Sequence, residues 1–440
     1  HRLKRAGVAA RDFVGLLMVR SLDTMCAMLG TLMLGAAYVP MGPDLPQERL
    51  RFIAKDAGLA AVAVCGDFLE LANKLASASE AVIQIVVMDK VGCGANNIAG
   101  SNGGHISVPT SSVMYILYTS GTTGQPKGVV VTHRAAASHV LACVQKFDLS
   151  ACDQVLQSIS LSFDFAVSQL FPYLVAGGSV LLPQEEITKD PSALAEMVSA
   201  AHVTSVDFVP TMFSFFMESS RLRRLLASVR RVNLGGEAVP SVLCEQVLSH
   251  LNARVFVTYG PTEVAVDSTT LGVHGPYSAV TVSPIGHADI WRFVHVLQRG
   301  SLTEFVPAGT PGELCVEGPG VALGYLNRKE QTSAAFVQAA FASGLSYHTG
   351  DLVRWRGHSG LDFLGRIDSQ VKLRGQRIEL GEVEVVLRAF QGITEAAVII
   401  LNAGSDSDAM LVGFVSPASS VKDVHEDLLS AASQQLPAYM

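Results

Sequence analysis

The segment Tyr118-Thr119-Ser120-Gly121-Thr122-Thr123-Gly124-Gln125-Pro126-Lys127-Gly128 lies between two apolar runs. Its glycines allow backbone conformations closed to other residues and let N–H groups approach a ligand closely. Its hydroxyls and the ammonium of Lys127 add donors suited to phosphate oxygens. The spacing does not fit the GxxxxGK[ST] loop of P-loop NTPases. A flexible Gly/Thr linker would share this composition, but such linkers rarely lie between buried strands. The segment therefore predicts a loop that binds phosphate groups.

Around this loop, short β-branched runs alternate with helical patterns through the first two-thirds of the chain. The runs typical of buried strands are Ala60–Cys65, Ala81–Met88, Ser179–Leu182, Val203–Val209 and Arg254–Thr258. Segments between them, such as Ser192–Ala201 and Ser241–Leu251, have helical periodicity. This alternation predicts layered α/β sheets with largely parallel strands.

The pattern changes near Gly365–Asp368. Before this point, Gly-rich stretches of short strands at Gly312–Tyr325 and Tyr347–Leu364 predict a β-rich subdomain. After it we expect a hairpin, a helix with one apolar face and two strands. These elements are the hairpin Gln370–Arg377, the helix face Leu380, Val383, Val386, Leu387 and Phe390, and the strands Ala396–Leu401 and Met410–Val415. We expect a hinge at Asp368 between a large domain of residues 1–366 and a small α+β domain of residues 367–440. Both ends of the chain are expected to be incomplete.

Composition narrows the function classes. The 440 residues are 49% hydrophobic and 16% charged, with a net charge of −7 and no dense Lys/Arg block. This balance argues against nucleic acid or an anionic membrane as the main partner. The seven cysteines include no CxxC pair, which favours scattered buried thiols in a reducing cytosol over disulfides or a structural zinc site.

Two further segments predict whether parts of the chain are buried, exposed or within a membrane. The apolar stretch Met25–Val39 is shorter than the roughly 20 residues of a membrane span, so we expect a buried helix followed by a strand. The segment Gly92–Ser112 is rich in Gly, Asn and Ser and is typical of a surface loop. Together with the cysteine pattern, these features predict a cytoplasmic protein.

The Tyr118–Gly128 segment resembles the phosphate loop of the adenylate-forming superfamily, which includes acyl-CoA ligases, luciferases and the adenylation domains of nonribosomal peptide synthetases. Other segments similar to the family's motifs follow in its order and spacing. They are Gly35–Pro40 (GAAYVP), Tyr259–Glu263 (YGPTE), Gly312–Leu326, Tyr347–Leu352 (YHTGDL), Gly365–Glu384 and Leu436–Met440 (LPAYM). The chain is identified as a member of this superfamily, most similar to an adenylation domain of a nonribosomal peptide synthetase.

The resemblance implies a two-step reaction. An amino acid and ATP give an aminoacyl-AMP and pyrophosphate, and the aminoacyl group then passes to the phosphopantetheine thiol of a carrier protein. Because a carboxylate must meet a phosphate, the site has to disperse negative charge and align the attack. The implied cofactors are ATP and Mg²⁺, and the implied partners are a peptidyl carrier domain and neighbouring condensation domains.

The residues implied for the nucleotide follow from the matched motifs. The phosphates would contact Thr119, Ser120, Gly121, Thr122, Thr123, Gly124 and Lys127. Thr262 would contact the α-phosphate, and Glu263 would hold Mg²⁺, which prefers oxygen ligands. Tyr259 and Gly260 would contact adenine, Asp351 the ribose hydroxyls and Arg366 the nucleotide. As isolated residues, Glu263 and Asp351 would more simply be solvated loop carboxylates.

The segment Phe163–Val167 matches the position where amino-acid-activating members carry FDxS. A carboxylate at Asp164 can pair with the α-ammonium of an amino acid, which fatty and aryl acids lack. The alternative is that Asp164 caps a helix over Ala166–Leu174. The positions that align with the family's pocket lining are Asp164, Phe165, Ser168, Asp207, Asn233, Gly235, Thr258, Val266 and Asp267.

Two further acids in that set, Asp207 and Asp267, lie in apolar surroundings. A buried carboxylate without a partner is costly, so a cation from the substrate would balance the charge. The set therefore predicts a basic amino acid, closer to arginine than to lysine or ornithine. The alternative is that one aspartate hydrogen-bonds backbone or a small hydroxylated substrate.

The chain departs from the family pattern in several places. Val257 stands where relatives carry Asn, Leu323 where they carry Arg, and Ala166 where they carry the FDxS serine. The chain also stops before the segment in which relatives carry a catalytic lysine, so we expect weak adenylation without it. The remaining alternatives are an acyl-CoA or aryl-acid ligase, a degenerate docking module, and an amino-acid reductase or amide-forming enzyme using the same activation.

Overall fold

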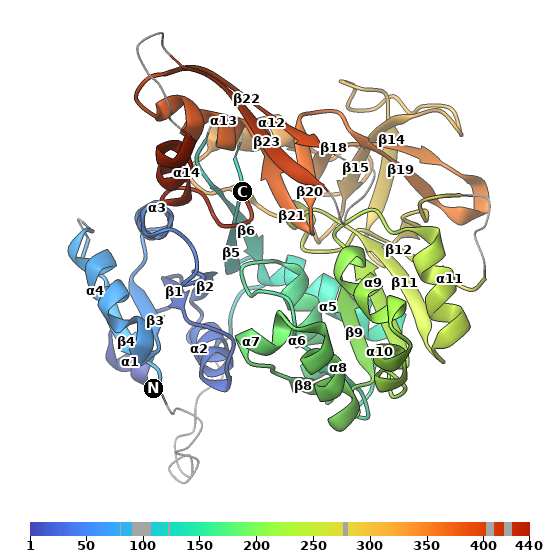
Figure 1. Ribbon diagram of the computed structural model, residues 1–440, viewed down its shortest axis with the longest axis horizontal. Coiled ribbons are helices and arrows are strands. Elements are labelled where there is room, and N and C mark those ends of the chain that lie inside the picture. The colour runs from blue at the N-terminus through green and yellow to red at the C-terminus, as the bar shows by residue number, and fades with distance from the viewer. Residues whose placement is uncertain (80, 90–106, 122–123, 276–279, 402–408, 418–424) are drawn as a thin grey trace. The chain divides into compact units, whose positions relative to one another are not determined.

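The computed structural model describes residues 1–440 except 80, 90–106, 122–123, 276–279, 402–408 and 418–424 (Figure 1). Thr122 and Thr123 of the predicted phosphate loop, Cys93 and most of the predicted loop Gly92–Ser112 lie outside the described residues. The chain folds into two compact units. Unit 1 comprises residues 1–133, 325–328 and 377–440, and unit 2 comprises residues 134–324 and 329–376.

Unit 1 is built on a mostly parallel sheet with the strand order β6-β5-β2-β1-β3-β4. Its strands are β1 (Phe13–Leu17), β2 (Ala37–Pro40), β3 (Ala61–Val64), β4 (Gln84–Val87), β5 (Val113–Thr119) and β6 (Lys127–Thr132). Its first helices are α1 (Arg2–Arg5), α2 (Leu22–Met33), α3 (Gln47–Ala57) and α4 (Leu69–Ser77). α2 and β2 are the helix and strand predicted for Met25–Val39. The core between α3 and the sheet includes Leu17, Val39, Leu50, Ile53 and Ile116.

The C-terminal part of unit 1 contains α13 (Leu380–Ala389), β22 (Ile393–Leu401), β23 (Met410–Pro417) and α14 (His425–Ser433). The antiparallel pair β22–β23 and the helix α13 lie where the sequence predicted them. Val383 and Leu387, on the predicted apolar face of α13, are buried. The predicted hairpin is also present as β20 (Gln370–Leu373) and β21 (Gln376–Glu379). Movement about Asp368 stays a prediction.

Unit 2 contains a second sheet in the order β13-β12-β11-β10-β9-β7-β8. The five strands from β11 to β8 are parallel, and β12 and β13 pair antiparallel at one edge. The strands are β7 (Gln154–Leu156), β8 (Ser179–Leu181), β9 (Ser205–Phe208), β10 (Arg231–Gly235), β11 (Arg254–Tyr259), β12 (Thr269–Val273) and β13 (His287–Ala288). This confirms the predicted α/β layers with largely parallel strands.

Helices cover this sheet, as the green and yellow-green part of Figure 1 shows. They are α5 (His133–Phe147), α6 (Phe165–Val175), α7 (Glu185–Thr188), α8 (Pro191–Ala200), α9 (Pro210–Glu218), α10 (Ser220–Leu225) and α11 (Ser241–His250). Their apolar faces pack on strand residues such as Val206, Val232 and Val255. α8 begins where Asp190 Oδ1 accepts a hydrogen bond from Ser192 N, an ordinary N-cap.

An antiparallel sheet completes unit 2 and confirms the predicted β-rich subdomain. Its strands are β14 (Phe293–Leu297), β15 (Gly312–Glu317), β17 (Phe336–Gln338), β18 (Leu345–Trp355) and β19 (Leu361–Arg366), with α12 (Lys329–Ala335) preceding β17. The register of β18 with β19 places Asp351 opposite Arg366. Two residues that the sequence implicates in nucleotide binding are therefore neighbours across one ladder.

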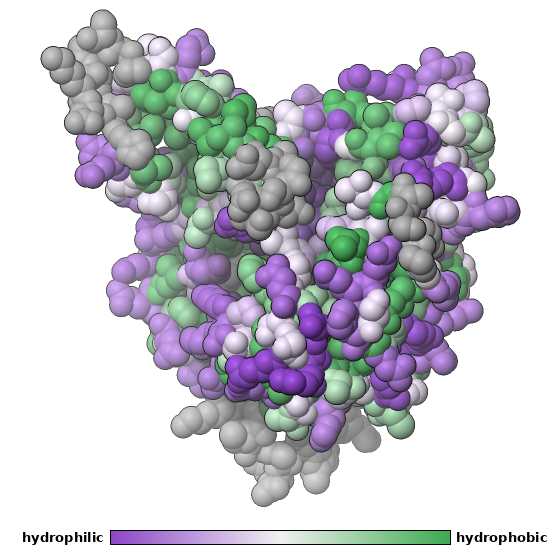
Figure 2. Space-filling model, turned by 45° about the vertical axis from the view of Figure 1, so that its right-hand side comes forward, coloured by the Kyte–Doolittle hydropathy of each residue, from purple (hydrophilic) through white to green (hydrophobic). Residues whose placement is uncertain are grey.

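Hydrophilic and hydrophobic side chains are intermixed over the face shown in Figure 2. Among the described residues, no helix has both the length and the apolar character needed to cross a membrane. The six cysteines in the described part of the chain are all free thiols.

Candidate active site

The predicted phosphate loop connects β5 to β6 in unit 1, where Thr119 and Lys127 are paired across the antiparallel ladder. Gly121 is required at its place because a Cβ there would lie 2.0 Å from the carbonyl oxygen of Gln125. Ser120 Oγ donates to the carbonyl of Arg377 at 2.8 Å, and Gly121 N donates to Glu382 Oε2 at 3.1 Å. A donor-rich loop is therefore held at its base by the C-terminal segment of the same unit.

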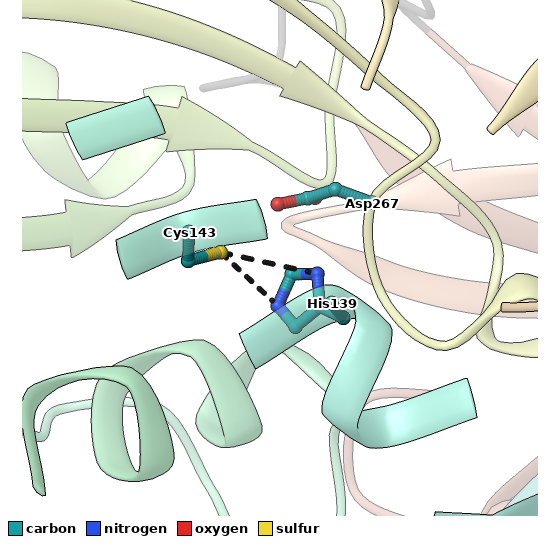
Figure 3. A group of neighbouring side chains, drawn as sticks. All are labelled: His139, Cys143 and Asp267. Carbon is teal, nitrogen blue, oxygen red and sulfur yellow. Dashed lines mark hydrogen bonds between the residues drawn. The ribbon is translucent and has the colours of Figure 1, made fainter. Parts of the chain in front are cut away.

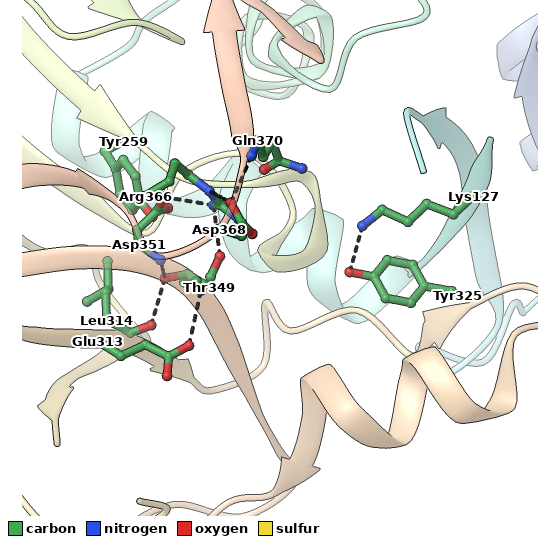
Figure 4. Close-up of polar contacts among 11 residues, drawn as sticks. Lys127, Tyr259, Glu313, Leu314, Tyr325, Thr349, Asp351, Arg366, Asp368 and Gln370 are labelled. Atoms are coloured by element: carbon green, nitrogen blue, oxygen red, sulfur yellow. Dashed lines mark hydrogen bonds and ion pairs between the residues drawn. The ribbon is translucent and has the colours of Figure 1, made fainter. Parts of the chain in front are cut away.

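Lys127 is held in place by an aromatic ring. Its ammonium lies 4.5 Å from the ring centroid of Tyr325, at the end of the short strand β16 (Gly324–Tyr325), and donates to the tyrosine hydroxyl at 3.3 Å (Figure 4). Leu326 N donates to the carbonyl of Gly128 at 2.8 Å, which fixes this tyrosine beside β6. The sequence linked Lys127 to phosphate but gave no indication of its partner.

Asp351 is the centre of a hydrogen-bonded group in unit 2 (Figure 4). Its carboxylate accepts hydrogen bonds from the hydroxyl of Tyr259 and, at 2.7 Å, from Arg366 Nη1. Arg366 also donates twice to Asp368, from Nε at 2.9 Å and from Nη2 at 2.5 Å. Tyr259, Asp351, Arg366 and Asp368 thus form one hydrogen-bonded network. The sequence had predicted separate roles for them, in contacts with adenine, ribose and the nucleotide and in the hinge.

A small cavity lies beside Tyr259. Its volume is about 30 Å³, and the residues that line it include Gly236, Glu237, Ala238, Phe363 and Lys372. The ring of Tyr259 is 6.2 Å from that of Phe363, and the ammonium of Lys372 lies 5.5 Å from the Tyr259 centroid. The flat ring of Tyr259 beside this cavity is a feature on which a purine base can stack.

The turn that follows Tyr259 is strained. Ala265 and Val266 both adopt left-handed conformations, with φ of 55° and 77°, which is rare for a β-branched residue. Gly260 makes the turn possible because a Cβ there would lie 2.0 Å from the carbonyl oxygen of Val266. Glu263, in the single-turn helix of this segment, is fully buried, and its carbonyl accepts a hydrogen bond from Ala322 N at 2.8 Å. Such strain commonly accompanies functional sites.

Sheet register gathers the predicted amino-acid pocket in unit 2. Asp207 pairs with Asn233 across β9 and β10, and Gly235 pairs with Thr258 across β10 and β11, near the carboxyl ends of these parallel strands. A Cβ on Gly235 would lie 2.7 Å from Thr258 Oγ1, so only glycine leaves room there. Ligands bind at this end of strands in open α/β sheets.

Several polar atoms in this region are enclosed but accept or donate no hydrogen bond within the described residues. They are the Oδ2 atoms of Asp164, Asp207 and Asp267, both amide atoms of Asn233, and Thr258 Oγ1. Asp207 and Asp267 are 3% and 4% exposed, and Asn233 is not exposed at all. Native interiors rarely leave so many polar atoms unpaired, so the cluster points to a ligand with several polar groups.

The three carboxylates influence one another. Burial raises the pKa of Asp207 to about 6. Burial, opposed by the charge of Lys146 and assisted by those of Asp289, Asp164 and Asp207, raises the pKa of Asp267 to about 7. Burial also raises the pKa of Asp164 to about 6, partly offset by the hydroxyl of Thr262. Asp164 is therefore close to Thr262, which the sequence predicted to contact the α-phosphate, and to Asp267 of the predicted pocket. It occupies the N-cap position of α6 but makes no capping hydrogen bond.

Comparisons with known proteins agree with this geometry. The family described as "AMP-binding enzyme" matches residues 1–326. The chain belongs to the AMP-binding enzyme family. Vanchrobactin synthetase VabF of Vibrio anguillarum and tyrocidine synthase 3 of Brevibacillus parabrevis are each 34% identical over all of this chain. The chain spans only 16% and 7% of those two proteins.

Solved structures place this AMP-binding chain among adenylation domains. The Vibrio cholerae adenylation domain AlmE, solved with glycyl-adenosine phosphate, aligns with a TM-score of 0.84 and 25% identity over 100% of this chain and 85% of that one. FmoA3, described as a nonribosomal peptide synthetase, aligns with a TM-score of 0.73 and 28% identity over 83% of this chain and 38% of that one. The chain is thus similar over its whole length to part of two nonribosomal synthetases, and it belongs to the AMP-binding enzyme family that its sequence predicted.

One group of residues near the pocket of this AMP-binding enzyme was missed at the sequence level. His139, Cys143 and Lys146 lie on one face of α5, and the first two converge with Asp267 (Figure 3). His139 Nε2 is 2.8 Å from Ser168 Oγ and 3.5 Å from Cys143 Sγ. Burial lowers the pKa of His139 and raises that of Cys143, so both are neutral near pH 7. The signal was a polar stripe at helical spacing on an alanine-rich helix.

Proposed function

We propose that this chain activates an amino acid with a basic side chain, forming an aminoacyl-AMP from ATP and releasing pyrophosphate. The observation that carries the proposal is the enclosed group of unpaired polar atoms around Asp164, Asp207 and Asp267. In this arrangement Asp164 pairs with the α-ammonium, and the other two acids face the side chain. Neither a fatty acid nor an aryl acid would supply a cation to Asp164.

The nucleotide groups fit the same reaction. Mg²⁺ bound with ATP would offset negative charge on the phosphates, and Glu263 is the carboxylate of the YGPTE segment proposed to hold it. Lys127 and the backbone donors of the β5–β6 loop would bind phosphate oxygens. Tyr259, Asp351 and Arg366 would position the nucleoside. The hydrogen bonds that Asp351 accepts from Tyr259 and Arg366 hold its carboxylate in an orientation suited to ribose hydroxyls.

The side-chain preference rests on charge. Asp207, Asp267 and the neighbouring Asp289 contribute three carboxylates, and Lys146 contributes one ammonium, which lies 3.0 Å from Asp289 and 4.0 Å from Asp267. Lys146 and Arg231, whose charge also lowers the pKa of Asp207, supply two cations against these three acids. A guanidinium from arginine would supply a third cation, with several donors for the unpaired oxygens.

The proposal is tested by amino-acid-dependent exchange of pyrophosphate into ATP in the presence of Mg²⁺. A panel should include arginine, lysine, ornithine, leucine and citrulline, the neutral isostere of arginine. Arginine is expected to give the highest kcat/KM. A preference for leucine or citrulline would overturn the basic-substrate proposal, and no exchange with any amino acid by the full-length protein would overturn amino-acid activation.

We further propose that a carrier-protein thiol receives the aminoacyl group, since NpsA-ThdA of Klebsiella oxytoca, an artificial adenylation–PCP fusion, has the same fold. An assay with a phosphopantetheinylated carrier domain and with free coenzyme A separates this acceptor from that of an acyl-CoA ligase. Faster transfer to coenzyme A would reject the carrier proposal.

A further inference from the structure

Lys146 is a buried cation at the base of the amino-acid pocket. It comes from the last turn of α5, and its side chain is only 12% exposed. Its ammonium donates to Thr270 Oγ1 at 2.7 Å and to Asp289 Oδ2 at 3.0 Å. Asp267 Oδ2 lies 4.0 Å from the same ammonium, beyond hydrogen-bond distance. The ammonium therefore donates a hydrogen bond to Asp289 and lies near Asp267 without a hydrogen bond to it.

The other charged groups near this point are accounted for. Arg231 contacts Asp153 at 3.4 Å and donates to the carbonyl of Phe147 at 2.8 Å, and its charge also lowers the pKa of Asp207. Arg292 donates to Ser138 Oγ at 2.8 Å. His139 and Cys143 are neutral because burial lowers the pKa of the first and raises that of the second. The local balance is thus set by Lys146, by Arg231 on the side of Asp207, and by the carboxylates Asp207, Asp267 and Asp289.

We propose that Lys146 is a specificity-determining residue that tunes how strongly the pocket prefers a cationic side chain. It neutralises one of the two carboxylates it faces and leaves the other, with Asp207, to attract the substrate. Removing the ammonium should make the pocket more selective for a cation, and removing its bonded partner Asp289 should make it less selective. This inference rests on the proposed function and extends it to residues outside the aligned pocket positions.

Loss of Lys146 and loss of Asp289 are expected to change the selectivity in opposite directions, and this difference separates a counter-ion from a residue with a structural role. A residue that only supports the fold would weaken binding of charged and neutral ligands alike. A counter-ion instead changes their ratio, because one charge is added to or removed from a site of low dielectric constant. A change of about tenfold in the ratio, or about 1.4 kcal/mol, is expected, since proton uptake by the raised-pKa aspartates absorbs part of the effect.

The experiment measures the Kd values of two nonhydrolysable ligands, the sulfamoyl-adenosine analogues of arginyl-AMP and citrullyl-AMP, by calorimetry. The selectivity is the citrullyl Kd divided by the arginyl Kd. The variants are Lys146→Met, Asp289→Asn and the double variant, which removes the ion pair without leaving an unpaired charge. Lys146→Arg keeps the charge, and Lys74→Met removes a surface lysine that contacts Glu70 at 2.7 Å.

We expect selectivity to rise about tenfold in Lys146→Met, to fall about tenfold in Asp289→Asn and to return within about threefold of the parent in the double variant. Lys146→Arg and Lys74→Met should match the parent.

If the parent prefers the arginyl analogue and all variants keep the same ratio within about twofold, the role of Lys146 is refuted while the proposed function stands. If the parent binds neither analogue, or binds both equally, the proposed function fails first. Should one of the single variants Lys146→Met and Asp289→Asn fail to fold, the other still decides, because loss of a counter-ion changes the ratio of the two affinities whereas a structural role would lower both affinities in parallel.

Discussion

Asp164 is the residue on which the proposed choice of substrate class depends. Its Oδ2 atom is enclosed and makes no hydrogen bond among the described residues, although Asp164 occupies the N-cap position of α6. Because this carboxylate does not cap its helix and its Oδ2 atom accepts no hydrogen bond, that atom can accept a hydrogen bond from a ligand. The sequence predicted this residue from its motif, and the absence of a capping hydrogen bond removes the main support for the alternative interpretation.

Asp164→Asn is expected to lower affinity for an aminoacyl-adenylate analogue about 100-fold, or about 2.7 kcal/mol, because the substrate ammonium loses its buried counter-charge. Calorimetric titration measures this loss. Asp190→Asn is the matched control, since Asp190 caps α8 away from the pocket and asparagine caps equally well. Equal affinities for the parent and Asp164→Asn would reject the assignment of the α-ammonium to this residue.

The pocket acids also predict a pH dependence. Burial raises the pKa values of Asp164 and Asp207 from 3.8 to about 6 and that of Asp267 to about 7. The folded state therefore holds protons that the unfolded chain has already released, and this contribution to stability is present at low pH and lost as pH rises through 6 to 7. A cationic ligand binds the ionised acids, so its affinity should rise across the same interval.

Titrations of the arginyl analogue between pH 5.5 and 8 should show this increase, whereas the citrullyl analogue should change less. Asp267→Asn removes the group with the highest pKa and should flatten the upper part of the curve. A constant ratio of the two affinities across this range would contradict the proposed ionisation of the pocket.

At the scale of elements, the loop between β5 and β6 depends on close backbone contact. The sequence identified its glycines as sites of ligand approach. The structure adds a reason internal to the protein at Gly121, whose missing Cβ makes room for the carbonyl of Gln125. Sequence reasoning could not provide this contact, because it depends on how the hairpin closes over the residues between Thr119 and Lys127.

Gly121→Ala is expected to destabilise the protein by about 2 kcal/mol and to weaken Mg-ATP binding at least tenfold, because backbone atoms cannot yield as a side chain can. Chemical unfolding and a fluorescent ATP titration measure the two effects. Gly30→Ala is the control: Gly30 is in the helix α2, and its added Cβ would meet only Leu3 Cδ1, at 3.8 Å. That change should stabilise the helix by about 0.5 kcal/mol and leave ATP binding intact. Normal ATP binding by Gly121→Ala would reject the role of this contact.

At the scale of the molecule, the α/β layers, the β-rich subdomain and the elements around the motifs followed from periodicity and from the resemblance. The pairing of distant residues did not. The sequence placed Lys127 in a phosphate loop but could not reveal Tyr325, which lies far along the chain. Lys146 was missed for the same reason, because a lysine near the end of a helix is usually solvated and only the fold brings Asp289 to it. Local sequence patterns predict helices and strands. The partner of a buried charged residue depends on which distant segments the fold brings together, and local patterns do not contain that information.

The longest of these connections joins the two ends of unit 1. Arg49 on α3 contacts Glu382 on α13 at 2.5 Å, with side chains only 5% and 2% exposed, and the other oxygen of Glu382 accepts from Gly121 N. A buried ion pair that loses one member leaves an unpaired charge, which typically costs 3–5 kcal/mol, whereas loss of both members costs much less. Arg49→Met and Glu382→Leu should therefore each lower the free energy of unfolding by about 3 kcal/mol, and the double variant should be more stable than the sum of the two changes implies. Denaturant unfolding of the four proteins measures the coupling.

The exposed pair Lys74–Glu70, at 2.7 Å, is the control and should show little coupling because solvent screens both charges. Additive effects of Arg49→Met and Glu382→Leu would mean that the N-terminal sheet and the C-terminal segment are held together by apolar packing and not by this ion pair.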